Sequence, residues 1–427
     1  MRIAKSALLE PERNQVYGVA ATALSFFVFA YSTRFGQVSI LAYYGLWFPL
    51  VLVDYRRVLG NYARYGWIFG FALVCFLSTF WSAAPSASLR AAVQYLTHIV
   101  CALIAMRVLA PATFSRGAVC GSILVLLYSL AFGSYHYDPL DGTYSFVGAF
   151  SSKNQLGLYA SLGVFFSYTT AVVFRARGLW LPLSLGGGLL SIYSLFASQS
   201  ATSVITTLAV LAVGLGLQLV LFLAPRQRRI LFVVAAALAA GCAVVALQMG
   251  ALDAILGVFG KDSTLTGRTY LWQQGIAAAG ASPWLGVGYQ AYWVQGFPEA
   301  ERLWDDFFIT SRSGFHFHNT YIETMVETGL AGTLLLVFVL SRTLLGHLRR
   351  FLFVGRSPQS LMLFLISTLL LVRSFVEIDI MHPYHVGSFP LYFGAGRLTL
   401  PERECSRMAL VADRWGHVAY GHPRGLD

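Results

Sequence analysis

Charged residues are scarce in this sequence. Only 11% of its 427 residues are Asp, Glu, Lys or Arg, whereas about a quarter of an average soluble domain is charged. Hydrophobic residues make up 57%. A soluble protein of this composition could not cover its surface with polar groups, but a chain that crosses a membrane repeatedly does not need to, because lipid is its solvent. The composition therefore predicts a polytopic membrane protein.

Cysteine and lysine are also rare. The five cysteines lie mostly inside apolar runs and have no metal-like spacing, so we read them as small apolar residues and expect neither disulfides nor a cysteine metal site. The net charge is +11, which by itself would suit a nucleic-acid partner. We expect no such partner, because the charges lie in short loops between apolar runs and not along one face.

The apolar runs are long enough to cross a bilayer, which takes about 20 residues each. They predict an all-α fold of about 11–12 transmembrane helices. The run at 178–197 contains Pro182 and three consecutive glycines, which predict a kink or a close helix contact. The run at 385–400 is short and contains Pro390, so it is the weakest candidate for a full crossing. The runs lie at about 16–32, 36–53, 65–82, 88–107, 117–134, 154–174, 178–197, 201–223, 230–250, 320–341, 359–376 and 385–400.

The basic residues predict the orientation. With a cytoplasmic N-terminus, 22 of the 30 Lys and Arg residues fall on the cytoplasmic side and 8 on the other, as the positive-inside rule requires. The first run lacks a cleavage site, so we expect it to be retained. The chain then divides into the first nine transmembrane helices (1–250), a large external loop with short helices (251–318), the C-terminal transmembrane helices (319–400) and a cytoplasmic tail (401–427).

Positive charge on the external side calls for an explanation. Lys153 lies just before a predicted helix, where it would add a point charge to the positive helix end and attract an anion such as diphosphate. Alternatively, Lys153 reaches the membrane interface and Asn154 caps the helix.

Two arginines raise the same question. Arg268 begins a segment that predicts a short amphipathic helix, with Leu271 and Trp272 toward lipid or protein. Its guanidinium could form a bidentate contact with phosphate or a loop salt bridge to Asp253 or Asp262. Arg373 stands at a span end, where it could face the same cavity or simply pair with the glutamate four residues on, Glu377.

A histidine stands at the mouth of the next predicted span. His318 has the side chain whose free pKa lies nearest neutral, so it suits general-base chemistry. Glu323 and Glu327 are four apart on one helical face and could orient the imidazole. The alternative is a structural His that caps the helix. A metal site could be assembled from His316, His318, His382 and His385, but no fixed spacing supports one, and we expect no metal.

These motifs, taken in order, resemble the O-antigen ligase/polymerase superfamily, and most of all its Wzy-type exopolysaccharide polymerases. The match runs from about residue 145 to 380. Ser152 stands where the family often has a histidine. The motifs are Phe150-x-x-Lys153-Asn154-Gln155-Leu156-Gly157, Ser198 to Ser203, Thr266-Gly267-Arg268-Thr269-x-x-Trp272, Pro283-x-x-Gly286-x-Gly288, and His318-Asn319-x-Tyr321 followed by Glu327-x-Gly329.

The resemblance implies a multi-pass glycosyltransferase of the GT-C-like type in the bacterial inner membrane, with its catalytic loop in the periplasm. It implies a glycan donor on undecaprenyl diphosphate, an acceptor glycan, contact with membrane lipid and with other polysaccharide assembly proteins, and no cofactor. Arg268 and His318 match the functional arginine and histidine of the family's long periplasmic loop. The pattern leaves open polymerase or ligase, the latter moving a finished glycan to lipid A-core or another acceptor. A polysaccharide transporter or flippase is the alternative from another class.

A mechanism follows from these residues. The diphosphate leaving group needs charge compensation, not a general acid, and cationic side chains can supply it without a metal. His318 would deprotonate the acceptor hydroxyl, and direct displacement would invert the anomeric centre. The residues expected to bind the diphosphate are Lys153, Arg268, Arg312 and Arg373, and those expected to support the site are Asn154, Asn319, Glu323 and Glu327.

Overall fold

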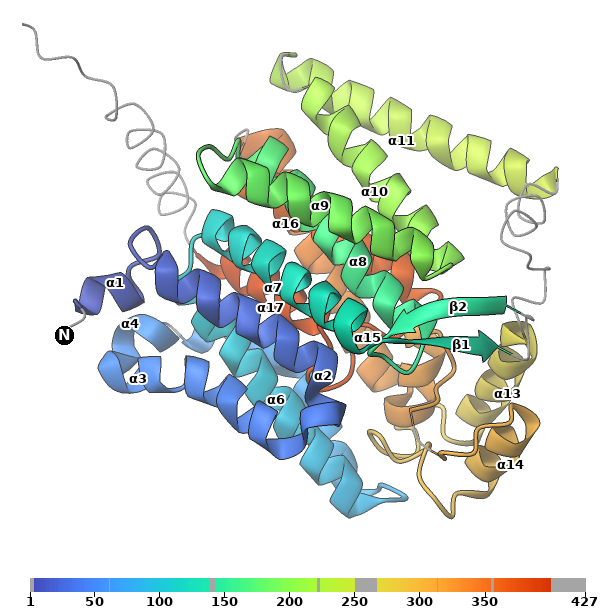
Figure 1. The fold of residues 1–427 in the computed structure, drawn as a ribbon. Coiled ribbons are helices and arrows are strands. Elements are labelled where there is room, and N and C mark those ends of the chain that lie inside the picture. The colour runs from blue at the N-terminus through green and yellow to red at the C-terminus, as the bar shows by residue number, and fades with distance from the viewer. Residues whose placement is uncertain are drawn as a thin grey trace, which may run out of the picture.

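A computed structural model shows the protein as a bundle of long apolar helices (Figure 1). The structure describes residues 4–60, 62–138, 143–220, 223–249, 267–312, 314–354 and 357–400. Within these ranges, eight helical segments are long and apolar enough to cross a membrane, so the predicted all-α polytopic fold is confirmed. These segments are Val16–Val53, Tyr55–Phe80, Pro85–Val108, Pro111–Phe132, Lys153–Val173, Trp180–Ala197, Ala201–Leu219 and Thr320–Phe353.

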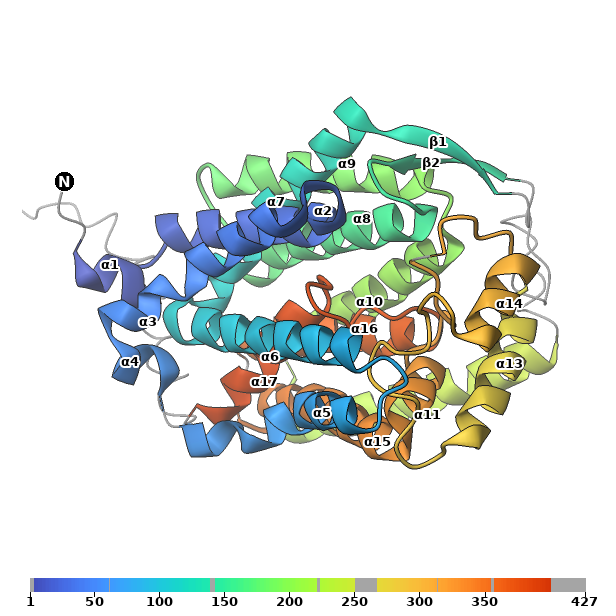
Figure 2. The same ribbon diagram turned by 90° about the horizontal axis from the view of Figure 1, so that it is seen from below.

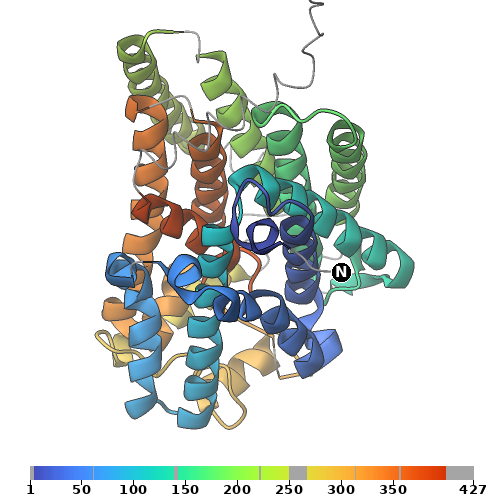
Figure 3. The same cartoon turned by 90° about the vertical axis from the view of Figure 1, so that its left-hand side faces the viewer.

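Most helices run side by side, and the short helices of residues 268–306 lie at one end of the bundle (Figures 1 and 2). The N-terminus lies at the other end, which faces the viewer in Figure 3. The long helices are α2 (Val16–Trp47), α6 (Pro85–Val108), α7 (Pro111–Phe132), α8 (Lys153–Tyr168), α9 (Trp180–Ala197), α10 (Ala201–Leu219), α11 (Pro225–Gln248), α15 (Thr320–Arg349) and α16 (Pro358–Ser374). The shorter ones are α1 (Lys5–Leu9), α3 (Pro49–Val53), α4 (Tyr55–Leu59), α5 (Gly66–Leu77), α13 (Arg268–Ala281), α14 (Pro298–Asp306) and α17 (Ser388–Thr399).

The first two predicted runs form a helical hairpin. Helix α2 is broken at Tyr31 and Gly36, whose backbone angles are not helical. The Tyr17 hydroxyl donates to the Leu46 carbonyl, and the Trp47 indole N–H donates to the Ser25 hydroxyl at 3.0 Å. These cross-contacts show that the two halves of α2 fold back on each other, as expected for runs 16–32 and 36–53.

Small residues allow the helices to approach closely. A Cβ added to Gly163 of α8 would lie 2.1 Å from the Ser191 hydroxyl of α9, and one added to Gly187 would lie 2.8 Å from the Ile123 side chain of α7. In lipid, where no hydrophobic effect draws helices together, such close packing is a main source of association. Gly187 of the 178–197 run therefore serves a close helix contact, whereas nothing lies within 4 Å of a Cβ added to Gly186. Helix α9 continues through Pro182 without a break.

Two expectations from the sequence need correction. The run at 385–400 gives only the 12-residue α17, too short for a membrane crossing of about 20 residues. In addition, residues expected in a loop after α7 form an antiparallel hairpin of β1 (Ser134–Asp138) and β2 (Thr143–Gly148). The hairpin lies at the same end of the bundle as α13 and α14 (Figure 1). The tail at 401–427 and the first part of the long loop, 250–266, lie outside the described residues.

The segment between α13 and α14 is fastened to a break in α15. Gly329 interrupts the helix with φ of 63°, and the backbone of residues 283–288 packs into the gap. Leu330 N–H donates to the Pro283 carbonyl at 2.8 Å, and Gly288 N–H donates to the Glu327 carbonyl at 2.9 Å. The loop is therefore fixed to α15 through backbone hydrogen bonds.

We expect Gly329→Ala to destabilise the protein. The added Cβ would lie 2.2 Å from the backbone of Trp284, in a left-handed conformation that costs a non-glycine residue roughly 1–3 kcal/mol. The measurement is the thermal midpoint of the detergent-solubilised protein by size-exclusion chromatography, which should fall by several degrees. Gly280→Ala is the matched control, because nothing lies within 4 Å of its added Cβ. Equal midpoints for both variants would contradict the prediction.

Candidate active site

A polar cavity of about 960 Å³ lies where the bundle meets the long loop and the hairpin. Its walls come from the start of α8, the start of α13, the residues before α15 and the segment that follows α16. The cavity thus brings together regions that are far apart in the sequence. The basic, acidic, histidine and amide side chains that line it are Lys153, Asn154, Gln155, Arg268, Gln290, His136, His316, His318, Glu327, Arg373, Glu377, Asp379, His382 and His385.

Arg268 is the first residue of α13, after Gly267 in a left-handed conformation. Its guanidinium donates to the Glu377 carboxylate at 2.9 Å and to the Val376 carbonyl at 2.8 Å. Burial opposes ionisation of Glu377, but Arg268 and His318 outweigh it and hold the pKa of this carboxyl well below its ordinary value. The buried, ionised Glu377 therefore holds Arg268 at the cavity wall. The sequence had not suggested this partner for Arg268.

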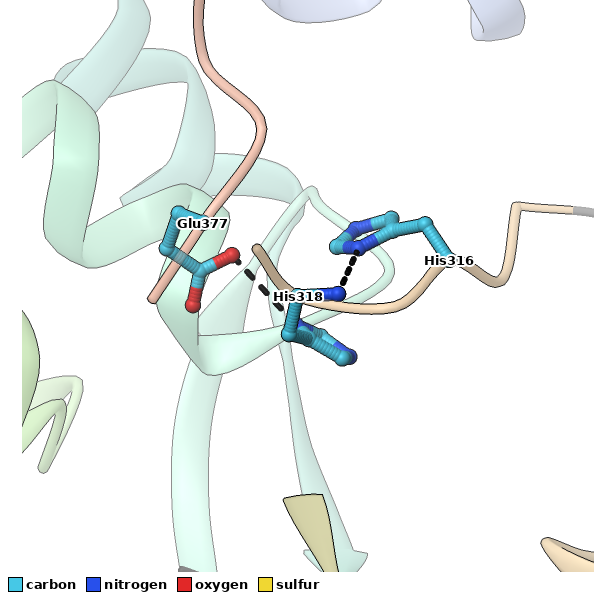
Figure 4. A group of neighbouring side chains, drawn as sticks. All are labelled: His316, His318 and Glu377. Atoms are coloured by element: carbon cyan, nitrogen blue, oxygen red, sulfur yellow. Dashed lines mark hydrogen bonds and ion pairs between the residues drawn. The ribbon is translucent and has the colours of Figure 1, made fainter. Parts of the chain in front are cut away.

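His318 contacts the same carboxylate. Its Nδ1 lies 3.4 Å from Glu377 Oε2, as the dashed line in Figure 4 marks. The residue has φ of 52°, an uncommon conformation for a non-glycine residue, and its backbone N–H donates to His316 Nδ1 at 3.1 Å. Glu377, and not the predicted Glu323 or Glu327, therefore orients the imidazole.

The residues around His318 hold it in place from both sides. Phe317 donates its N–H to Glu323 at 2.7 Å, and its carbonyl accepts from the Trp272 indole at 2.9 Å. Asn319 is the N-cap of α15, since its side chain accepts from the N–H groups of Tyr321 and Ile322. The capping role therefore belongs to Asn319, and His318 is left to face the cavity.

Lys153 is the first residue of α8 and lines the cavity with only 8% of its surface exposed. Ser152 caps this helix by accepting from Gln155 N–H at 3.3 Å. Asn154 instead accepts from the Ser200 hydroxyl at 2.9 Å, so it joins α8 to the start of α10 and does not cap α8. The lysine and the helix N-terminus both place positive charge at the cavity wall.

The other two predicted arginines differ from each other. Arg373 is 1% exposed and lines the cavity. Its guanidinium donates to Asp379 at 2.5 Å and to Ser203 at 3.1 Å, so it does not pair with Glu377. Arg312 is largely exposed, pairs with Glu301 and Asp305 and is absent from the cavity lining. The structure thus brings Lys153, Arg268 and Arg373 together and leaves Arg312 apart.

Two groups of side chains in the described ranges have the composition of a metal site. One is His316, His318 and Glu377, whose candidate ligand atoms lie within 4.8 Å of one another (Figure 4). Burial and the neighbouring His318 lower the pKa of His316, so this imidazole is neutral near pH 7. The Glu377 carboxylate is already paired with the Arg268 guanidinium at 2.9 Å, so it would have to give up that ion pair to bind a metal ion. This group therefore fits an ion pair better than a metal. The other group is Glu323, Glu327 and His382.

Sequence reasoning did not identify Glu377 and Asp379 as the acidic partners of the cavity. Both follow the end of α16 within five residues of Ser374. The available signal was the sequence Arg373-Ser374-Phe375-Val376-Glu377-Ile378-Asp379, in which two acidic residues stand immediately after a span. Ionisable groups at such a position are costly unless they pair or face a polar cavity, and here they do both.

The fold and the cavity define a polytopic helical membrane protein with a site of lysine, arginine, histidine and acidic side chains at one end of its bundle. Residues 186–337 match the family model described as O-Antigen ligase. The chain is also 62% identical over 425 residues to the "Exopolysaccharide production protein ExoQ" of Rhizobium meliloti (strain 1021), covering 100% of this chain and 98% of that protein. The chain therefore belongs to the O-antigen ligase family, alongside this exopolysaccharide production protein. Family membership supports a polysaccharide polymerase or ligase type of role.

We expect the stability that Glu377 contributes to depend on pH. Its folded pKa is below the ordinary value of 4.5, so the contribution is complete above about pH 4.5 and is lost as the pH falls further, toward the folded pKa. The thermal midpoint of the wild type should exceed that of Glu377→Gln by a constant amount between about pH 6 and pH 8. The gap should narrow at about pH 4.

Asp306→Asn is the control for this measurement. Asp306 pairs with Arg302 at 3.2 Å on an exposed surface, where an ion pair contributes less than about 1 kcal/mol. Its midpoint should stay close to that of the wild type across the same pH range. A gap for Glu377→Gln that grows on acidification would show that the carboxylate is not held ionised by Arg268.

Proposed function

We propose that the chain is a glycosyltransferase that polymerises oligosaccharide repeat units carried on undecaprenyl diphosphate. One observation carries the proposal: cationic side chains from three distant parts of the chain meet His318 in one cavity. A diphosphate donor requires positive charge at its phosphates, and an acceptor sugar requires a base at its hydroxyl. The described cavity offers both at one end of the bundle.

The cations serve the leaving group. As the bond between the anomeric carbon and the diphosphate oxygen breaks, negative charge grows on the diphosphate. Lys153 and Arg268 compensate this charge, and the buried Arg373 adds to the positive field although it is bonded to Asp379. A guanidinium has five N–H donors, so Arg268 can hold Glu377 and still face phosphate oxygens. A metal ion is not required for this step.

His318 serves the acceptor. With Nδ1–H directed to Glu377, the imidazole presents Nε2 as the nitrogen that accepts a proton. The acceptor oxygen forms the new glycosidic bond and its proton passes to Nε2, while the diphosphate leaves with the electrons of the old bond. The Glu377 carboxylate stabilises the imidazolium that forms. The attack comes from the face opposite the leaving group, so the product has inverted configuration.

We favour polymerisation over ligation because of the name of the exopolysaccharide protein that this chain resembles. The 62% identical relative is an exopolysaccharide production protein by name, and growth of such a polymer consists of joining repeats. The excess of arginine at the cytoplasmic loops favours a cavity on the periplasmic side of a bacterial inner membrane, with both termini in the cytoplasm. A ligase that transfers the finished glycan to lipid A-core or another acceptor is the second candidate, since the family model bears that description.

We expect Arg268→Ala and His318→Ala to abolish long-chain polymer. Loss of a general base typically slows a reaction by about 10²–10⁴-fold, and loss of the arginine removes charge compensation in a water-poor site. The variants are expressed in a strain that lacks the gene, and the polysaccharide is resolved on gels. Arg90→Ala is the control, because Arg90 is exposed and is not part of the cavity lining. Wild-type amounts of polymer from folded, membrane-inserted versions of both variants would overturn the mechanism.

The same deletion strain separates the two candidate reactions. A polymerase consumes lipid-linked single repeats, so its loss should cause them to accumulate. A ligase consumes the finished chain, so its loss should cause long lipid-linked polymer to accumulate. The lipid fraction of the deletion strain, analysed by mass spectrometry, is expected to contain single repeats.

A further inference from the structure

Two polar side chains in the cavity have no part in the mechanism above. Glu327, on α15, is only 1% exposed and lines the cavity together with His382. The Oε2 atom of Glu327 and the Nε2 atom of His382 are buried and have no hydrogen-bond partner. A buried polar atom without a partner costs free energy that a hydrogen bond would recover. These two atoms therefore point to a ligand that can hydrogen-bond.

Their spacing suits one hydroxyl group. A carboxylate oxygen of Glu327 and a ring nitrogen of His382 lie within 4.8 Å of each other. A hydroxyl oxygen placed about 2.8 Å from each would bridge them. A hydroxyl is both donor and acceptor, so it can satisfy the carboxylate and the imidazole at once.

The third member of the cluster, Glu323, is not available to a ligand. Its Oε1 accepts from the Trp293 indole and its Oε2 accepts from Phe317 N–H, both at 2.7 Å. A protein zinc site usually has at least three protein ligands, and in this cluster only Glu327 and His382 have a buried atom without a hydrogen-bond partner. The arrangement therefore favours a hydroxyl over a metal ion.

Both side chains are held on fixed backbone. Gly288 N–H donates to the carbonyl of Glu327 at 2.9 Å. The Tyr289 hydroxyl donates to the Met381 carbonyl at 2.6 Å, next to His382. Residues 288 and 289 thus link the two binding groups through consecutive positions of one loop. Trp293, which also lines the cavity, provides an aromatic surface of the kind that sugars pack against.

We propose that Glu327 and His382 bind a hydroxyl group of the acceptor sugar and so orient it for attack. The proposal rests on the proposed function, because it assumes a sugar acceptor beside His318. It assigns Lys153, Arg268 and Arg373 to the donor diphosphate, and Glu327 and His382 to the acceptor. It also gives the site a means of selecting the acceptor, since a sugar without the matching hydroxyl would leave both buried atoms unpaired.

The test separates acceptor binding from chemistry. Purified protein in nanodiscs receives lipid-linked repeats from the deletion strain as donor and the same repeat, released from its lipid, as acceptor. For Glu327→Gln and His382→Gln we expect the acceptor KM to rise by about tenfold to a hundredfold, with kcat within about threefold and the donor KM unchanged. Glu299→Gln makes the same chemical change on the exposed face of α14 and should leave all three parameters unaltered.

Three other outcomes would overturn the proposal. An unchanged acceptor KM in both folded variants shows that the pair does not touch the acceptor. If wild-type protein carries a tightly bound divalent metal, measured by mass spectrometry, and Glu327→Gln loses it, the cluster is a metal site. If Glu327→Gln fails to insert, His382→Gln decides the matter alone. If wild-type protein itself adds no sugar, the proposed function falls and this proposal with it, a result distinct from a defect confined to the variants.

Discussion

The site depends on one buried carboxylate, Glu377, and on the two groups that share it. Its side chain is 7% exposed, and it lies 2.9 Å from Arg268 and 3.4 Å from His318. A lone charge at this position would be costly, and removing one partner of such a pair is strongly destabilising because the other stays buried and uncompensated. The arginine therefore keeps Glu377 ionised, and the ionised carboxylate fixes the imidazole. Charge compensation and base positioning are linked through one residue.

Other contacts join the two chain segments that this interaction connects. Thr320 donates its hydroxyl to the Glu377 carbonyl at 2.7 Å, and Asn319 donates to the Phe375 carbonyl at 2.9 Å. The start of α15 and the segment after α16 are thus joined at consecutive positions. The Arg373–Asp379 pair extends the connection to α10 through Ser203. Polar contacts thus cross-link helices at this end of the bundle, and the cavity forms there.

The sequence allowed prediction of the residues but not of their pairing. Apolar runs, the arginine bias and the scarcity of external cations were enough to predict an all-α membrane protein and to single out Lys153, Arg268, Arg373 and His318, all of which line one cavity. The spacing of Arg373 and Glu377 suggests an i,i+4 pair, but α16 ends at Ser374, so the two do not share a helix face. Likewise, Glu323 follows the Asn319 cap, whereas His318 precedes it, and the helix directs the glutamate to Trp293. Such end points are set by tertiary contacts that spacing does not encode.

A transferase that joins two sugars needs two kinds of surface in one cavity, and their chemistry conflicts. A diphosphate requires net positive charge, whereas a sugar requires neutral hydrogen-bonding groups that do not attract phosphate. In the described cavity these surfaces lie on different elements. The lysine and arginine side chains lie at the starts of α8 and α13 and at the end of α16. Glu327 lies on α15, one helical turn after Glu323, whose carboxylate accepts a hydrogen bond from the Trp293 indole. Each substrate group would therefore meet the side chains suited to it, and donor and acceptor would bind in one relative arrangement.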